Sequence, residues 1–191
     1  MHLPPLAYRL WQKAFVAPKL APLLGHELFA DARSVCELGC GPGSNFPFLA
    51  SRKYLGIDIG EDHIRYANRT YGQHFVVGDV SASVDWIDER FDIVLVHSVL
   101  HHLDDEQVVR TLVHARQLLS PGGSLHIFDV VMPPWWTLAG VLARLDEGHH
   151  IRVWESWESL FSRSIGSYQR TDFPLRLLGL EAYRMFHLVS R

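Results

Sequence analysis

The chain has 191 residues, of which 48% are hydrophobic and 20% are charged. That length fits one domain, and that composition is typical of a globular protein rather than a disordered one. The formal net charge of −3 predicts no basic surface for nucleic acid, so we expect no nucleic-acid partner. The longest uncharged run, 130–143, is too short to span a bilayer and contains Pro133 and Pro134. We predict no stable membrane insertion, with peripheral contact of this run as an alternative.

The N-terminal part of the chain is predicted to be helical. Apolar residues favour helices over 6–16 and 20–30, separated by Pro18 and Pro22. Residues 1–5 have neither a basic start nor a long apolar stretch, so we expect no signal peptide.

The chain has two cysteines, Cys36 and Cys40. The first falls in a predicted strand and the second in the turn that follows it, so a disulfide would distort both elements. We therefore expect free thiols and a reducing, cytoplasmic location.

Strands and helices alternate from residue 34 onward. Short apolar runs predict five strands, at 34–38, 54–58, 75–77, 91–97 and 125–131. The segments between them predict helices at 44–51, 61–70 and from Asp104 to a stop at 120–123. Gln107 lies three residues after Asp104, which is the spacing of a capping box. Such alternation predicts an α/β fold with a doubly wound, mostly parallel sheet.

The C-terminal part has a different pattern. Helices are predicted at 135–145 and 154–161, and strands at 168–178 and 181–190 with a turn near Gly179. The two strands predict an antiparallel hairpin at the edge of a seven-stranded sheet. We therefore expect a single domain with four parts, namely an N-terminal helical cap (1–30), a core (31–131), a helical lid (132–166) and a C-terminal hairpin (167–191).

The first predicted strand runs directly into Glu37-Leu38-Gly39-Cys40-Gly41-Pro42-Gly43. Three glycines at alternate positions make a tight turn, so a ligand can approach bare backbone N–H groups in front of a helix N-terminus. Glu37 would repel a phosphate but tolerate a cationic amino or sulfonium group. The dinucleotide-binding pattern requires a third glycine where this chain has Ser44.

Three more polar residues follow the next predicted strands. Asp58 ends the second strand, about twenty residues after the first glycine, where a carboxylate can accept from both ribose hydroxyls. Asp79 follows the third strand, where it can accept from an adenine amine. His97 ends the fourth strand. Ligands bind at the carboxyl ends of strands in open parallel sheets, so we predict one site for all of these residues.

Together these residues resemble four successive motifs of the class I S-adenosylmethionine (SAM)-dependent methyltransferases, over about 34–131. The resemblance implies in-line transfer of a methyl group from SAM, with S-adenosylhomocysteine (SAH) as product. The aromatic residues of the cap and lid, and the missing signatures of macromolecular substrates, favour a small, partly apolar acceptor that is methylated on O, N, S or C. The resemblance also implies that the glycine turn and Glu37 surround the methionine part, that Asp58 holds the ribose and that Ile59, Asp79 and Val80 contact the adenine. The cofactor-binding residues implied are Glu37, Gly39, Cys40, Gly41, Gly43, Asp58, Ile59, Asp79, Val80 and His97.

The candidate catalytic residues are His97, His101 and Asp129. The resemblance favours a structural role for paired histidines after the fourth strand, with a general base or a metal ligand as alternatives. Neither a His-Glu-x-x-His motif nor a Cys/His cluster supports zinc, so we predict no metal. Asp129 ends the fifth strand, where it either faces the acceptor or caps a loop.

Aromatic residues in the cap and the lid are the candidate acceptor contacts: Tyr8, Trp11, Trp135 and Trp136. A further set, Trp154, Trp157 and Phe161, fits one helix face. The alternative is that these rings only pack helices onto the sheet. Two other functions stay open, a SAM-binding sensor or subunit without catalysis and an NAD-dependent oxidoreductase. A domain of this size is compatible with a monomer or a homodimer.

Overall fold

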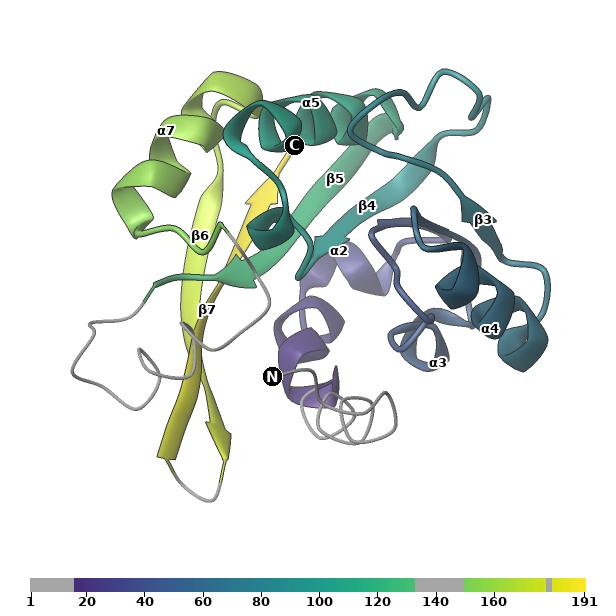
Figure 1. The fold of residues 1–191 in the computed structure, drawn as a ribbon, viewed down its shortest axis with the longest axis horizontal. Coiled ribbons are helices and arrows are strands. Elements are labelled where there is room, and N and C mark those ends of the chain that lie inside the picture. Colours follow the sequence, from purple (N-terminus) through teal and green to yellow (C-terminus); the bar gives the residue numbers. More distant parts are fainter. Residues whose placement is uncertain (1–15, 133–149, 178–179) are drawn as a thin grey trace.

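A computed structural model describes residues 16–132, 150–177 and 180–191, and Figure 1 shows its arrangement. Seven strands form one sheet in the order β3-β2-β1-β4-β5-β7-β6. β1 to β5 pair in parallel, whereas β7 is antiparallel to both β5 and β6. The predicted fold class is confirmed. The strands are β1 (Ser34–Leu38), β2 (Lys53–Asp58), β3 (Phe75–Val77), β4 (Phe91–His97), β5 (Leu119–Val130), β6 (Gln169–Leu177) and β7 (Leu180–Ser190).

Helices cover both faces of the sheet. Figure 1 shows α5 and α7 together on one side, whereas α2, α3 and α4 lie apart from them on the other. A helix over 16–24 precedes α2. The other helices are α2 (Glu27–Ala30), α3 (Phe46–Leu49), α4 (Glu61–Tyr71), the short 3₁₀ helix η1 (Leu100–His102), α5 (Asp105–Gln117) and α7 (Trp154–Ser164). No helix within the described ranges is both long and apolar enough to cross a bilayer.

The core consists of two apolar clusters, one on each face of the sheet. In β4, Val94 and Val96 belong to the cluster under α5 and α7, while Ile93 and Leu95 belong to the cluster on the opposite face. All four side chains are fully buried. A parallel strand covered on both faces is apolar at almost every position, which is why 91–97 is recognisable from the sequence.

One prediction for the N-terminal part was wrong. Residues 16–24 form a helix that continues through Pro18 and Pro22 instead of ending between them. Leu20 and Leu23 are fully buried in the core, and this burial offsets the backbone hydrogen bonds that a proline cannot make. The break comes instead at residues 25–26, and His26 then caps α2 by accepting from Leu28 N. Residues 6–15 lie outside the described ranges.

The segment 119–124 also differs from the prediction. Helix α5 ends with Leu118 as its C-cap, close to the predicted stop, and its Asp104–Gln107 capping box is confirmed. However, β5 begins at Leu119 rather than at residue 125, and it shifts register against β4 inside the Pro-Gly-Gly stretch. A Cβ on Gly123 would lie 2.9 Å from the carbonyl oxygen of Phe91. The glycines therefore make a bulge within a strand, not a loop before one.

The aromatic face of α7 belongs to the core. Trp157 and Phe161 are fully buried, stack with ring centroids 5.6 Å apart and both contact Phe186 of β7. The indole N–H of Trp157 donates to Val130 O at 3.0 Å. The interpretation that these rings pack the helix onto the sheet is therefore confirmed for Trp157 and Phe161. Helix α7 contacts both β5 and β7. In Figure 1 the far end of the β6–β7 hairpin extends beyond the rest of the sheet. Cys36 and Cys40 are buried free thiols, as expected.

Candidate functional site

The glycine turn lies between β1 and α3, at the carboxyl edge of the parallel strands. Gly39, Gly41 and Gly43 all have positive φ, at 75°, 52° and 76°. A Cβ on Gly39 would lie 2.6 Å from the Val99 side chain, and one on Gly43 would lie 2.8 Å from the Phe75 ring. A Cβ on Gly41 would meet nothing within 4 Å. Two glycines are thus needed for packing, while Gly41 leaves its surface open to a ligand.

Asp58, at the end of β2, holds this turn in place. One of its carboxylate oxygens accepts from Gly41 N and the other from Gly60 N, both at 2.8 Å, with His63 Nδ1 3.5 Å away. Burial alone would raise the pKa of Asp58, but the hydrogen bonds from His63, Gly60 and Gly41 outweigh it and lower the pKa. The ionised carboxylate keeps further lone pairs, which are suitable acceptors for two ribose hydroxyls.

The segments after β2 and β3 offer an apolar surface and a polar edge. Ile59 is 69% exposed, although it directly follows a buried strand. Asp79 uses one oxygen to accept from Ser81 N at 2.9 Å and from Ser81 Oγ at 2.7 Å. Within the described part of the chain, the other Asp79 oxygen and Val80 N have no hydrogen-bond partner. An acceptor beside a backbone N–H matches the amine and ring nitrogen of adenine.

Glu37 is buried beneath the glycine turn, at 1% exposure. Its two oxygens accept from Asn45 Nδ2 at 2.6 Å and from the Tyr54 hydroxyl at 2.5 Å. Burial raises the pKa of Glu37 to about 7, against the opposing effect of these two hydrogen bonds. Sequence analysis missed Asn45 and Tyr54, because neither lies at a spacing that singles it out. The predicted contact of Glu37 with the methionine part stays a prediction.

The end of β4 carries two buried polar atoms that have no hydrogen-bond partner among the residues that the structure describes. His97 is 7% exposed, and its Nε2 has no hydrogen-bond partner within the described ranges. Burial, together with the positive charge of Lys19, lowers the pKa of His97 to about 3, so the ring stays neutral. Ser98 has a φ of 54°, which is rare for a residue with a Cβ, and its buried Oγ also has no partner in the described part of the chain. These atoms lie at the carboxyl end of β4, and the predicted contact of His97 with the cofactor stays a prediction.

The structure brings two of the candidate catalytic residues together. His101 Nδ1 lies 2.6 Å from one oxygen of Asp129, and both side chains are buried. The other Asp129 oxygen accepts from Leu100 N at 2.9 Å. Burial alone would raise the pKa of Asp129, but His101 and the N–H of Val130 lower it. Asp129 therefore orients the imidazole and fixes the loop after β4, an arrangement that general bases use.

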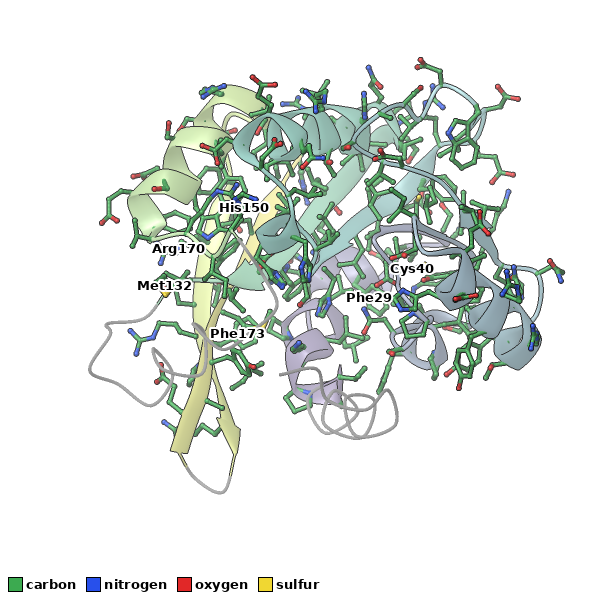
Figure 2. All side chains as sticks on the ribbon, in the orientation of Figure 1. Phe29, Cys40, Met132, His150, Arg170 and Phe173 are labelled. Atoms are coloured by element: carbon green, nitrogen blue, oxygen red, sulfur yellow. The ribbon has the colours of Figure 1, made fainter. Side chains whose placement is uncertain are left out.

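Several predicted residues remain outside this picture. Tyr8, Trp11, Trp135 and Trp136 fall outside the described ranges, so their acceptor contacts stay predictions. Among the residues that the structure describes, no three His, Cys, Asp or Glu side chains are grouped to hold a metal. Figure 2 shows Cys40, in the glycine turn, close to α3 and α4. Two surface hollows of about 360 and 430 Å³ are lined by segments other than the glycine turn, Asp58 and Asp79. The location of the candidate site therefore rests on the geometry of the turn and these carboxylates.

Comparison with known proteins agrees with this geometry. Residues 35–123 match a family model described as a methyltransferase domain. Trans-aconitate 2-methyltransferase of Variovorax paradoxus (strain S110) is 30% identical over 131 residues, which cover 64% of this chain and 48% of that protein. The chain spans half or less of the length of the curated relatives it matches.

Solved structures share the fold. The PH0226 protein from Pyrococcus horikoshii OT3 aligns with a TM-score of 0.66 and 21% identity, over 96% of this chain and 91% of its own. Magnesium protoporphyrin IX methyltransferase from Synechocystis PCC 6803 aligns with a TM-score of 0.68 and 18% identity, over 100% of this chain and 89% of its own. Residues 35–123 are therefore similar to a methyltransferase domain, and the chain as a whole has the fold of these solved structures.

Proposed function

We propose that this protein uses SAM to methylate a small molecule. The observation that carries the proposal is the open face of Gly41, whose N–H is held by Asp58 at the point where β1 and β2 end side by side. The structure named for magnesium protoporphyrin IX methyltransferase contains SAH, and that of human N-acetylserotonin methyltransferase contains SAM. Both share this fold.

The residues present fit such a cofactor. Gly41 leaves room at the turn, Asp58 supplies carboxylate acceptors for the ribose, and Ile59 offers an apolar surface for the adenine. Asp79 and Val80 N would bind the adenine edge. When bound, SAM would supply a methyl group already activated by the sulfonium charge, so the protein's main task is to position donor and acceptor.

The side chains around the end of β4 define what the protein itself contributes. Neutral His97 offers a buried nitrogen to a ligand, whereas Asp129 holds His101 in one orientation. A base is needed only when the acceptor atom must lose a proton. The paired geometry favours His101 over His97 for that role, because the low pKa of His97 makes it a weak base.

The acceptor in this proposal is a small molecule, methylated on O, N, S or C. The relative named trans-aconitate 2-methyltransferase supports this size class, as do the O- and N-methyltransferases among the structures with the same fold.

Turnover tests the proposal. Purified protein with methyl-labelled SAM and a panel of small carboxylic acids, phenols and amines should transfer label to at least one acceptor. Single alanine variants of His97, His101 and Asp129 then assign the base, and we expect at most one to act as one. SAH binding without turnover on any acceptor would favour a non-catalytic SAM-binding protein instead.

A further inference from the structure

Arg152, which lies two residues before the start of α7, is a buried cation outside the site described so far. Its side chain is 8% exposed, and the guanidinium lies over the ring of Trp157 at 4.8 Å. Among the described residues, its acidic partner is Asp105, at the start of α5, whose side chain is 70% exposed. A guanidinium buried to this degree needs most of its N–H groups bonded, which directs attention to its other partners.

Those partners are backbone carbonyls, two of them in the loop after β4 and one at His150. One terminal nitrogen of Arg152 donates to Leu100 O at 3.3 Å and to His150 O at 2.9 Å, and the other donates to Leu103 O at 2.7 Å. The Nε donates to Asp105 at 2.8 Å. A planar guanidinium with a fixed fork of donors can bond all these acceptors at once, which a lysine cannot.

This loop is the one that carries His101. Its amide groups bond to Asp129 of β5, through Leu100 N at 2.9 Å and His101 N at 3.3 Å. On the opposite side, His101 O accepts from His150 N at 3.0 Å. The Arg152 side chain thus bonds to both ends of η1 and to His150, whose N–H donates to His101 O. The backbone carbonyl of Arg152 in turn accepts from Met132 N at 2.9 Å. Met132 and His150 are labelled in Figure 2.

We propose that Arg152 is a positioning residue that fixes the loop after β4 through its carbonyls and so keeps His101 in register with Asp129. The inference rests on the proposed function for the role of His101 in methyl transfer. The arrangement itself is a property of the free protein. It can therefore be tested without an acceptor, and its failure would leave the cofactor and turnover experiments unaffected.

Nuclear magnetic resonance of the imidazole N–H groups provides the test. A proton in the short contact between His101 Nδ1 and Asp129 should give a far-downfield signal, which is assigned by its loss in His101→Gln. In Arg152→Lys the charge is kept but the carbonyls are not spanned, so we expect the signal to shift or disappear through exchange with water. Asp105→Asn removes the ion pair and keeps the carbonyl contacts, so its signal should stay at the wild-type position.

Two controls separate positioning from general destabilisation. Arg170, on β6, is another arginine whose guanidinium lies over an indole ring, in this case that of Trp154. Arg170→Lys should therefore leave the signal unchanged. Urea denaturation of each variant shows whether it is folded. If Arg152→Lys does not fold, Arg152→Gln replaces it in the test. The proposal is overturned if a folded Arg152 variant gives the His101 N–H signal at the wild-type position and with the wild-type rate of exchange with water. Equal loss of the signal in Asp105→Asn also overturns it, because the carbonyl contacts would then not be what holds the loop.

Discussion

Removal of the Asp58 carboxylate should weaken cofactor binding in addition to weakening the fold. In the free protein, Asp58→Ala leaves Gly41 N and Gly60 N without their acceptor, and in the complex it also removes the acceptor proposed for the ribose. A hydrogen bond to a charged group contributes about 1.5–3 kcal/mol. That corresponds to a roughly 10- to 150-fold increase in the Kd for SAH.

Calorimetric titration with SAH measures this effect, and thermal unfolding without ligand measures the change in the fold alone. Asp62→Ala is the matched control, because Asp62 lies nearby on α4 with a side chain that is 90% exposed and pairs only with Arg65 among the described contacts. We expect the control to bind SAH like the wild type. Unchanged SAH affinity in a folded Asp58→Ala variant would refute the ribose assignment.

Three further predictions concern the glycine turn and buried titratable groups. Gly41→Ala and Gly122→Ala both place a Cβ at positive φ with nothing within 4 Å, so each variant should lose about 1–2 kcal/mol of stability. Only Gly41→Ala should weaken SAH binding, by about tenfold or more. Equal SAH affinities of the two variants would show that the face of Gly41 is not used. Glu37 has a pKa of about 7 in the folded protein, so its own contribution to stability should fall by about 3 kcal/mol as pH rises from about 4.5 to 7. Glu37→Gln should therefore be more stable than the wild type at pH 8 in urea denaturation but not at pH 5. The reverse order at pH 8 would contradict this. His97, His126 and His187 have pKa values of about 3 when folded against about 6.5 unfolded, so the stability present above pH 6.5 should be lost on acidification, by about 2 kcal/mol for each histidine at pH 5. This loss is clearest in Glu37→Gln, where the opposing carboxyl is absent, and a flat urea midpoint from pH 7.5 to 5 in that variant would refute it.

The parts of the fold that the sequence predicted are those set by local patterns. The run 91–97 is apolar because β4 is covered on both faces, and the glycine turn is recognisable because positive φ leaves few alternatives to glycine. Asp58 and Asp79 follow their strands directly, so knowing the strands is enough to place them at one edge of the sheet. Each of these features depends on residues close together in the chain.

The parts that the sequence did not predict depend on distant contacts. His126 bonds to His187 across β5 and β7, 61 positions away, and no spacing rule links the two. Arg152 bonds to carbonyls near residue 100, and carbonyls have no sequence signature. The stretch 120–123 predicts the end of a helix, but proline and glycine mark turns and bulges alike, and only pairing with β4 shows that this stretch belongs to a strand. Pro18 and Pro22 were taken for helix ends because the burial of Leu20 and Leu23 cannot be seen locally.

Calorimetric titration of the purified protein with SAM and SAH, with NAD as the control ligand, tests the central claim most directly. The account predicts saturable, micromolar-range binding of both sulfur compounds and none of NAD, since the turn lacks the third glycine of the dinucleotide pattern and has Ser44 in its place. Binding of NAD with no binding of SAM or SAH would contradict it.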